Sequence, residues 1–419
     1  MISLWNLPVL RLVTTDRCRV AAPWFAWSHG GDPTAALRRR AADIEQRALG
    51  ATHVIERQLA ALVYLPLSIP RLLLALIRSG PALRSADRVS WWRQASHLIT
   101  CAWRLGLRPQ VYYQLRLHAR PRTSAWAAVI DPAELHHLQR AISPPDLAPL
   151  CDKLRFAERA FAHGLSAVPI LAVWQQGQRF PGIPPHAGDL QRDLFVKRAQ
   201  SYGSIGVMAF RYNPRTGVHY AADKRLPAAG LAATLAEASR HATLLVQPRL
   251  ANHRDLAGFS SGALCNYRIV TGRHPDGRTE IIVAALRFPL RSELTCAEAD
   301  TTLCASVDPA TGRLRAAESR NPALGRMTHH PVSGQPIEAH PVPRWAELQA
   351  LALRAHDAWP DFPFIGWDLC DTGEGILLLE GGCLWGGFLA QMSGSLPLGQ
   401  TAFTPIYHAH LKHRAGLRT

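Results

Sequence analysis

The spacing of apolar residues changes near residue 150, and this change limits the possible folds more than any other feature of the sequence. Before it, residues 34–62 and 91–107 carry apolar side chains three or four positions apart, the pattern of amphipathic helices. After it, short apolar runs alternate with helical segments and are separated by turns rich in Gly, Asp and Pro. We therefore expect a mainly helical domain over residues 1–150, followed by an α+β body.

The composition is that of a globular protein with a strong positive charge. Of the 419 residues, 47% are hydrophobic and 19% are charged, which is enough apolar material for two or three domains. Lysine and arginine together number 47 against 31 acids, giving a formal net charge of +16. The cations are spread along the chain without a basic run or an aromatic RNA-binding motif. We therefore expect no nucleic-acid partner, and favour acidic ligands such as phosphates or an anionic membrane surface.

Two features indicate a cytoplasmic location. The eight cysteines show no CxxC pair and no Cys/His zinc spacing, and several lie within apolar runs, so we expect reduced thiols in a core. Residues 1–20 lack the cationic start, the long apolar stretch and the cleavage site of a secretory signal, so we expect none.

The most apolar segment, residues 59–77, approaches the length of a membrane span. Pro66, Pro70 and Arg71 interrupt it, so we expect a pair of buried or interface-lying helices rather than a transmembrane helix. Peripheral contact with the inner face of a membrane stays open as an alternative. We expect three nearby tryptophans to lie in the core or at a domain interface: Trp91, Trp92 and Trp103.

Lysine is rare in this arginine-rich chain, with four among the 47 basic residues, and two of the four occupy informative positions. Lys197 ends the apolar run 193–198 and precedes the Gly/Ser loop 201–206, while Lys153 opens a predicted helix. Glycines let a backbone approach a ligand closely, and lysine offers a compact charge for a phosphate oxygen. The spacing is not that of a P-loop, and a plain hairpin turn explains the loop equally well. The apolar strand 244–250 enters a turn of the kind whose backbone hydrogen-bonds the edge of an adenine.

Two carboxylates lie in a predicted hairpin near the C-terminus. If its turn is centred on Gly373, Asp368 pairs opposite Leu378, and Glu380 lies one diagonal step away on the same face. Carboxylates so placed could share one or two magnesium ions, because magnesium takes few protein oxygens when phosphates supply the rest. The alternative is an exposed hairpin end with two solvated acids.

In their order along the chain, these segments resemble the ATP-grasp superfamily, and more narrowly its sugar-transfer-associated branch, which is related to α-L-glutamate ligases. The resemblance covers residues from about 150 to 412 and rests on five segments: 152–165, 193–207, 244–272, 307–314 and 364–382. It implies an ATP-grasp fold in which two α+β subdomains clamp ATP. The small lobe, 151–250, would hold the phosphate loop and the adenine hinge, and the large lobe, 251–419, the arginines and carboxylates.

The resemblance also implies roles for individual residues of the small lobe and its border. Lys153 and Lys197 match lysines that contact the ATP phosphates and the adenine side. The loop that closes over the triphosphate is matched by Ser201, Gly203, Ser204 and Gly206. The hinge whose backbone reads adenine is matched by Gln247, Pro248, Arg249 and Leu250. Asp255 is the candidate for the ribose contact, with His253 as a competitor.

On the large lobe the resemblance implies catalytic and metal-binding residues. Arg268 and Arg287 match arginines that hold the acyl phosphate or the transferred phosphoryl group. Asp368 and Glu380 match magnesium ligands, so ATP and Mg²⁺ are the implied cofactors.

One departure from the family pattern concerns the second metal ligand. The family has Glu-Gly-Asn there, whereas this chain has Glu380, Gly381 and Gly382. Glycine has no ligating side chain, so one coordination position is lost or is filled by water or by a neighbour such as Asp371 or Glu374. Either activity persists with weaker metal binding, or the protein is a degenerate relative that binds nucleotide.

The implied activity is ATP-dependent ligation of a small-molecule carboxylate to an amine through an acyl phosphate, in a glycan or natural-product pathway. Two alternatives stay open: a degenerate ATP-grasp protein that binds nucleotide or transfers phosphate, and a non-enzymatic scaffold of a membrane-associated pathway. The sequence identifies neither the substrates, nor the role of the helical domain, nor the oligomeric state.

Overall fold

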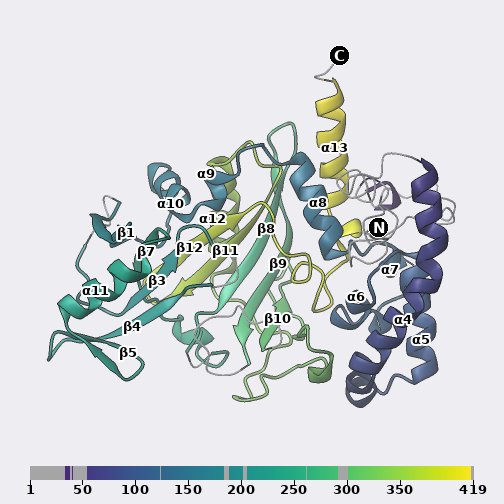
Figure 1. Cartoon of the computed structure of the whole chain (residues 1–419), viewed down its shortest axis with the longest axis horizontal. Helices are drawn as coiled ribbons and strands as arrows, with labels where there is room; N and C mark the ends of the chain where they lie inside the picture. Colours follow the sequence, from purple (N-terminus) through teal and green to yellow (C-terminus); the bar gives the residue numbers. More distant parts are fainter. Residues whose placement is uncertain are drawn as a thin grey trace, which may run out of the picture.

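The computed structural model describes residues 34–37, 40, 54–122, 124–183, 188–201, 205–260, 262–290 and 301–416. In Figure 1, a helical region lies on the right, a five-stranded antiparallel sheet at the centre and a seven-stranded antiparallel sheet on the left. The expected order, with helices first and an α+β body after them, is confirmed.

The helical region follows the predicted periodicity where the chain is described. The helix predicted within 91–107 is α5 (Trp91–Ile99), which continues as a short π-helix, η2 (Thr100–Arg104). Most of the helix predicted within 34–62 lies outside the described residues. The other helices here are α4 (Val54–Asp87), α6 (Pro109–Gln114), η3 (Leu117–Ala119), α7 (Ser124–Ala127), α8 (Pro132–Ile142) and α9 (Ala148–Cys151).

The most apolar segment forms one helix, not the pair of helices expected. α4 continues through Pro66 and Pro70 as far as Asp87. Proline fixes φ at a value that a helix accepts and removes one backbone hydrogen bond, so packing against α5 and α6 can hold the helix together. None of the helices within the described residues is long and apolar enough to cross a membrane.

The seven-stranded sheet contains the strands predicted for the small lobe. Among the described residues its order is β2-β1-β7-β3-β4-β5-β6. The strands are β1 (Ala172–Gln175), β2 (Gln178–Pro181), β3 (Leu194–Arg198), β4 (Met208–Asn213), β5 (Val218–Ala221), β6 (Lys224–Leu226) and β7 (Leu244–Pro248). Helix α11 (Ala228–Ala238) packs on this sheet through Leu231 and Leu235.

The five-stranded sheet has the order β10-β9-β8-β11-β12 among the described residues. Its strands are β8 (Asn266–Arg273), β9 (Thr279–Pro289), β10 (Thr302–Ser306), β11 (Phe364–Thr372) and β12 (Gly375–Gly382). The helices around it include α10 (Lys153–Ala162), α12 (Trp345–Asp357) and α13 (Phe403–Gly416). Strand β10 ends at Ser306, and two residues later Asp308 begins a turn in which its carboxylate accepts two backbone N–H groups.

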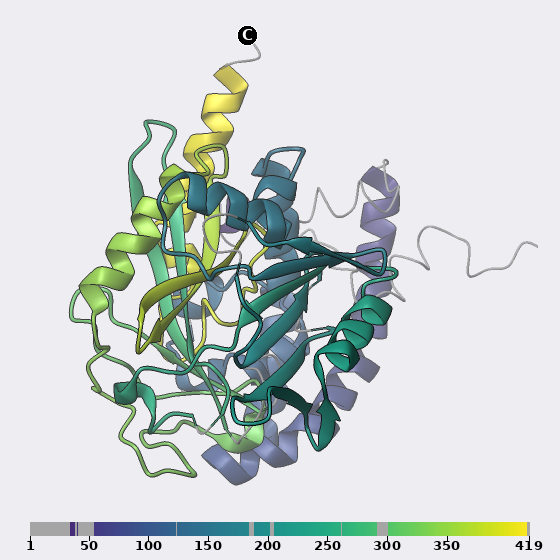
Figure 2. The ribbon, with the colours of Figure 1, turned by 90° about the vertical axis from the view of Figure 1, so that its left-hand side faces the viewer.

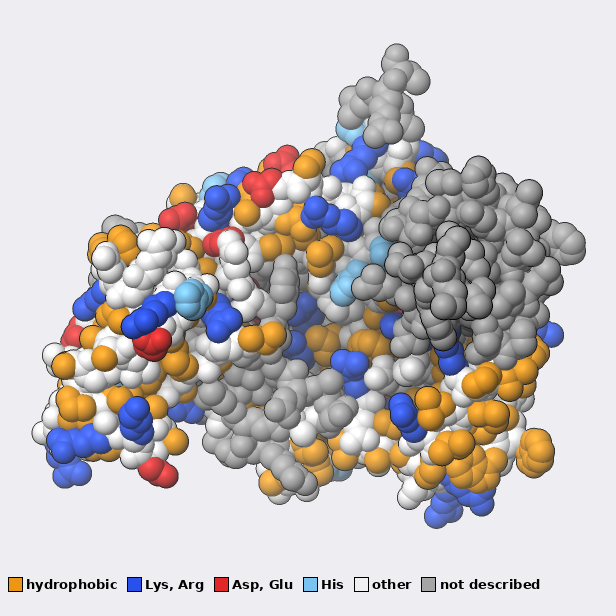
Figure 3. Space-filling model, viewed as in Figure 1, with side chains coloured by type: hydrophobic (Ala, Val, Ile, Leu, Met, Phe, Trp, Pro, Cys, Tyr) orange, Lys and Arg blue, Asp and Glu red, His pale blue; other side chains and the backbone are white. Residues whose placement is uncertain are grey.

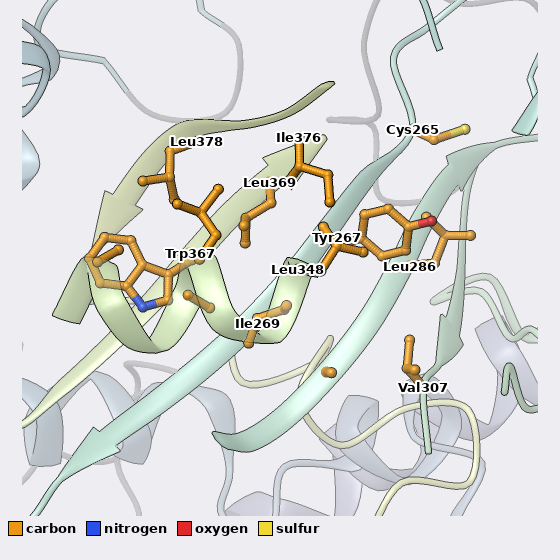
Figure 4. Close-up of a cluster of buried hydrophobic side chains, with 14 of the residues drawn as sticks. Cys265, Tyr267, Ile269, Leu286, Val307, Leu348, Trp367, Leu369, Ile376 and Leu378 are labelled. Atoms are coloured by element: carbon orange, nitrogen blue, oxygen red, sulfur yellow. The ribbon is translucent and has the colours of Figure 1, made fainter. Parts of the chain in front are cut away.

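Alternation along β8 and β11 gives the two faces of this sheet different environments. Tyr267, Ile269 and Trp367 point into a buried apolar cluster against α12 (Figure 4). Figure 2 shows α12 along the side of the sheet that faces away from the seven-stranded sheet. Neighbours in a strand point to opposite faces, so Arg268 and Asp368 face the other way, toward the seven-stranded sheet.

The face opposite α12 is also covered in part by α8 and α13. Val270 and Phe364 of the sheet share a core with Leu138 of α8 and with Phe403 and Tyr407 of α13. The Tyr407 hydroxyl donates to the carbonyl oxygen of Leu138 at 3.2 Å. Another core joins the helical region to β9 and β10. The helical region is therefore packed continuously onto the sheet that carries the predicted arginines and carboxylates.

Candidate functional site

A cavity of about 380 Å³ lies between the two sheets, and most of the predicted site residues line it. Its walls come from β3 and β7 on one side and from β8, β9, β11 and β12 on the other. The predicted residues in this lining are Lys153, Lys197, Ser201, Gln247, Pro248, Arg249, Leu250, Arg268, Arg287, Asp368 and Glu380. The structure thus brings the two lysines and the two carboxylates together in one place.

Lys153 reaches the cavity from the first turn of α10. Asp152 caps this helix, and its carboxylate accepts the backbone N–H of Leu154 at 3.0 Å. Lys153 Nζ donates to the carbonyl oxygen of Ser201 at 2.6 Å and lies 3.6 Å from Glu380 Oε2. This lysine therefore connects the loop after β3 with the end of β12.

Lys197 occupies a partly exposed position of β3, next to the buried Val196. Its Nζ donates to the carbonyl oxygen of Leu379 at 3.4 Å. Burial lowers the pKa of Lys197; the carboxylate of Glu380 opposes this shift and the ammonium of Lys153 adds to it. A desolvated ammonium with one long hydrogen bond is unfavourable, and an anion bound in the cavity would stabilise its charge.

The predicted adenine hinge spans the last two residues of β7 and the two residues after it, and β7 pairs with both β1 and β3. Gln247 is buried, and its Nε2 donates to the carbonyl oxygen of Val168 at 3.4 Å. The backbone N–H of Arg249 donates to the carbonyl oxygen of Asp193 at 2.9 Å. The hinge is thus held by neighbouring segments on both sides of the strand.

Asp368 and Glu380 are direct partners across β11 and β12. The predicted register, with Asp368 opposite Leu378, is wrong by two residues. Thr372 pairs with Gly375, so the turn is centred later than expected, and a bulge next to Asp368 shifts the ladder further. The two carboxylates therefore lie directly opposite each other, closer than the predicted diagonal arrangement.

Both predicted catalytic arginines bind Asp368. Arg268 lies opposite it on β8 and donates from Nε to Oδ1 at 2.7 Å and from Nη2 to Oδ2 at 3.1 Å. Arg287 of β9 donates from Nη2 to the same Oδ2 at 3.1 Å and from Nε to Asn266 Oδ1 at 2.6 Å. Burial alone would raise the pKa of Asp368, but the two guanidinium groups lower it below its ordinary value. The aspartate is therefore a charged anchor that orients both arginines.

The residues present fit a magnesium ion that is held mainly by nucleotide phosphates. A carboxylate offers about four lone-pair positions, and three hydrogen bonds to Asp368 are found among the described residues. The Glu380 side chain is 40% exposed, and a Cβ added at Gly382 would meet open space that could admit water. Within the described part of the chain, no group of three or more His, Cys, Asp or Glu side chains could hold a metal without phosphate oxygens.

The predicted phosphate loop is described only in part. Ser201 lines the cavity and provides the carbonyl oxygen that Lys153 binds. Gly203 and Ser204 lie outside the described residues. Gly206 does not line the cavity; its φ is +76°, and a Cβ there would lie 2.6 Å from the Nε of Arg198. Only glycine fits this position without strain.

The predicted ribose contact and the substitute metal ligands lie away from the cavity lining. Asp255, in the 3-10 helix Arg254–Leu256, places Oδ2 3.5 Å from His253 Nδ1. Asp371 binds Arg344 at 3.2 Å, and Glu374 lies in the hairpin turn. None of these four candidates lines the cavity, so their roles stay predictions.

Several lining residues were not predicted from the sequence. They include Cys151, Val168, Phe195, Leu264, Trp385 and Gly386. Phe195 precedes Lys197 by two residues, so the alternation of β3 could have placed it on the same face. Trp385 and Gly386 follow β12 in irregular backbone, where no spacing rule applies.

Cys151 and Cys383 bring two thiols together beside the cavity. Their Sγ atoms are 3.5 Å apart. The hydrogen bond from the Cys383 thiol lowers the pKa of Cys151 to about 7, against the effect of burial. The same contact raises the pKa of Cys383. Cys151 is therefore the more acidic thiol of the pair.

Solved structures with a similar course of the chain include ligases. The VanG D-Ala:D-Ser ligase from Enterococcus faecalis is 12% identical, with 66% of this chain and 63% of that chain covered at a TM-score of 0.36. The D-alanine–D-alanine ligase from Coxiella burnetii is 11% identical, with 65% and 61% covered at a TM-score of 0.34. This chain thus spans less than two thirds of the length of either structure. Likeness at this level does not extend to activity or substrate.

The sequence also matches a family model over more than half of its length. No curated protein matches the sequence. The family model described as sugar-transfer associated ATP-grasp matches residues 135–402, from the first turn of α8 to the start of α13. This range includes both sheets and every residue that lines the cavity. The chain belongs to the sugar-transfer associated ATP-grasp family.

Proposed function

We propose that this protein is an ATP-dependent ligase that joins a small carboxylic acid to an amine. One observation carries the proposal: Lys153, Lys197, Arg268 and Arg287 line the same cavity as Asp368 and Glu380. Four cations against two carboxylates give these side chains an excess of positive charge that complements a triphosphate. Membership of the ATP-grasp family supports ATP as the nucleotide.

In this proposal the seven-stranded sheet binds the nucleotide. The adenine lies against the hinge of Gln247 to Leu250, and the loop after β3 covers the phosphates. Lys153 and Lys197 offer ammonium groups to phosphate oxygens, which replace the long contact of Lys197 with a carbonyl oxygen. Closure of the loop would exclude water from a reactive intermediate.

The five-stranded sheet positions the acid. A carboxylate oxygen of the acid attacks the γ-phosphorus of ATP, the bond from γ-phosphorus to the bridging oxygen breaks, and ADP leaves. The amine then attacks the carbonyl carbon of the acyl phosphate, loses a proton and releases inorganic phosphate, leaving an amide. Arg268 and Arg287, oriented by Asp368, hold the transferred phosphoryl group and neutralise its charge.

Asp368 and Glu380 would hold magnesium together with the nucleotide phosphates. When bound, the ion supplies further neutralisation of the phosphate charge. Glu380 contributes an exposed carboxylate, and Asp368 contributes the oxygen positions that the arginines leave open.

A second candidate function is nucleotide binding without ligation. It is favoured by Gly382, which stands where the family pattern has a ligating Asn, and by the three arginine bonds to Asp368. Both features weaken the metal site that ligation uses.

We also propose the division expected from the sequence: a helical domain over 1–150, a small lobe over 151–250 and a large lobe over 251–419. The substrates would be small molecules of a glycan or natural-product pathway, handled in the cytoplasm. The helical domain would recognise the acceptor or a partner, because it packs on the sheet that holds the arginines.

The test is a screen for ADP release with ATP and magnesium across pairs of small carboxylic acids and amines. We expect release that requires both an acid and an amine. Lys197→Ala and Glu380→Ala should abolish it, whereas Lys224→Ala, on the exposed strand β6, should not. Mass spectrometry of the amide product would identify the reaction.

Other outcomes of the screen favour the alternatives. ADP release that needs an acid but no amine would point to phosphate transfer. Stabilisation of the fold by nucleotide, without turnover under any condition, would point to the degenerate binder. Unchanged turnover in Lys197→Ala and Glu380→Ala would overturn the site assignment.

A further inference from the structure

The outer face of α4 exposes a row of large apolar side chains. Ile69, Leu73, Leu74 and Ile77 are 46%, 53%, 45% and 68% exposed. The opposite side of the helix supplies the buried core of the helical region, including Leu72. α4 is therefore apolar on two sides. Its buried side packs into the core of the helical region, and its exposed side does not.

The N-terminal turn of α5 extends this row. The ring of Trp91 packs against α4 at Gly80, where a Cβ would overlap it, and lies 6.0 Å from the Arg84 guanidinium carbon. Trp92 is 87% exposed. The prediction that Trp92 lies in the core or at a domain interface of the chain is wrong, because Trp91 takes the position against α4. We call the following residues the α4–α5 face: Ile69, Leu73, Leu74, Ile77, Trp91, Trp92 and Ile99.

Arginines are frequent in the segment that forms the α4–α5 face. Figure 3 shows orange side chains gathered at the lower right, over α4 and α5, with blue side chains at their edge. Between residues 68 and 104 the sequence has six arginines: Arg71, Arg78, Arg84, Arg88, Arg93 and Arg104. The one acid of this stretch, Asp87, is bound by Arg116 and by His118. The face is thus apolar at its centre and positive at its margin.

We propose that the α4–α5 face docks on an anionic phospholipid membrane. Aliphatic side chains and tryptophan partition into the boundary between head groups and acyl chains, and the arginines at the edge reach lipid phosphates. Contiguous exposed apolar side chains of this size mark interaction sites on soluble proteins. A second copy of the chain is the less suitable occupant, because a symmetric pairing of this face would bring two arginine margins together.

This inference does not rest on the proposed ligase activity. The α4–α5 face lies in the helical region, and none of its residues lines the cavity between the sheets. Vesicle binding can therefore be measured without nucleotide or substrate.

The test measures co-sedimentation of the full chain with vesicles of phosphatidylcholine alone, or with phosphatidylglycerol at about 30% of the lipid. We expect binding to the anionic vesicles and little to the neutral ones. The double variant Ile77→Ser, Trp92→Ser should bind the anionic vesicles at least about tenfold more weakly, because two apolar side chains no longer partition. Val332→Ser, Leu396→Ser is the matched control, since both residues are similarly exposed outside the α4–α5 face.

Charge reversal tests the margin separately. Arg78→Glu, Arg93→Glu should also weaken binding by about tenfold or more, and added salt should weaken binding of the unchanged protein. Arg225→Glu, Arg240→Glu is the matched control on β6 and after α11. Unchanged thermal unfolding midpoints verify that each variant is folded.

Three results would overturn the proposal: no binding to anionic vesicles, equal binding to neutral vesicles, or equal binding by the variants and their controls. Light scattering measures the mass of the protein in solution and so tests whether a second copy of the chain occupies the face instead. If the unchanged protein is a dimer that ignores vesicles and Ile77→Ser, Trp92→Ser is a monomer, the face is a contact between copies instead.

Discussion

Charged side chains on the two walls of the cavity differ in how they are paired. On the five-stranded sheet, Asp368 accepts three hydrogen bonds from two arginines at 2.7 to 3.1 Å. On the seven-stranded sheet, the hydrogen bond found for the Lys197 ammonium within the described residues is one to a carbonyl oxygen at 3.4 Å. Asp368 is thus paired within its own sheet, whereas Lys197 is a half-buried cation with a weak partner.

In the proposed function, this difference corresponds to two tasks. The arginine wall has a fixed geometry before any ligand arrives, which suits a group that must hold a transferred phosphoryl in one orientation. The lysine wall gains most when an anion enters, which suits nucleotide capture. Substitutions on the first wall should therefore change stability, and substitutions on the second should change ligand affinity.

The largest effect is expected for Asp368→Asn. Loss of this carboxylate leaves two buried guanidinium groups without their counter-ion, so the free energy of unfolding should fall by about 3–5 kcal/mol. Asp357→Asn is the matched control, because Asp357 binds Arg273 at 2.9 Å but is 69% exposed. The control should cost less than about 1 kcal/mol in urea unfolding. Equal losses of unfolding free energy in the two variants would show that Asp368 stabilises the fold no more than an exposed ion pair does.

A smaller effect, on ATP affinity and not on stability, is expected for Lys197→Met. The apolar side chain removes a desolvated ammonium, so the thermal unfolding midpoint should rise or stay the same. ATP affinity, measured by calorimetry, should fall about tenfold to a hundredfold because a charged contact with phosphate is lost. Lys224→Met on β6 should change neither quantity. A fall in stability with unchanged affinity would show that Lys197 is a structural residue.

The smallest effect concerns the Cys151 thiol, which lines the cavity at the end of α9. With the pKa of Cys151 lowered from 9.0 to about 7, its alkylation by iodoacetamide should reach half its maximal rate near pH 7. Bound ATP should slow the reaction, because Cys151 lines the cavity. Cys151→Ser should remove this phase of alkylation, as followed by mass spectrometry. A half-maximal rate near pH 9, unaffected by ATP, would place the thiol outside the nucleotide site.

The strands that carry charge could be predicted because their alternation is regular. Arg268 and Asp368 each lie between buried apolar neighbours, so period-two spacing places them on the face opposite the core. Lys197 could be found because lysine is rare in this chain and here precedes a Gly/Ser loop. The selection of Arg268, Arg287 and the hinge residues came instead from the resemblance to the ATP-grasp family, which rests on the order of the segments along the chain.

Features that depend on tertiary contacts could not be predicted from the sequence. The bulge beside Asp368 has no signature in the sequence, so the register of the hairpin was missed. The pairing of Asp368 with both arginines depends on the neighbouring strand β8 and on β9 beyond it. The exposure of Trp92 depends on which of two adjacent indoles packs against α4. The ion pairs of Asp368 depend on residues that are far apart in the sequence. The exposure of Trp92 depends on a choice between two neighbouring residues of the same type.

The shared core of α8, α13 and the five-stranded sheet limits where the chain can be shortened. Phe364 and Val270 on the sheet pack against α8, which precedes the two lobes, and against α13, which lies at the end of the large lobe. A chain shortened to begin at residue 151 would lose α8 and the carbonyl oxygen that accepts the Tyr407 hydroxyl, so part of this face of the sheet would be exposed to solvent.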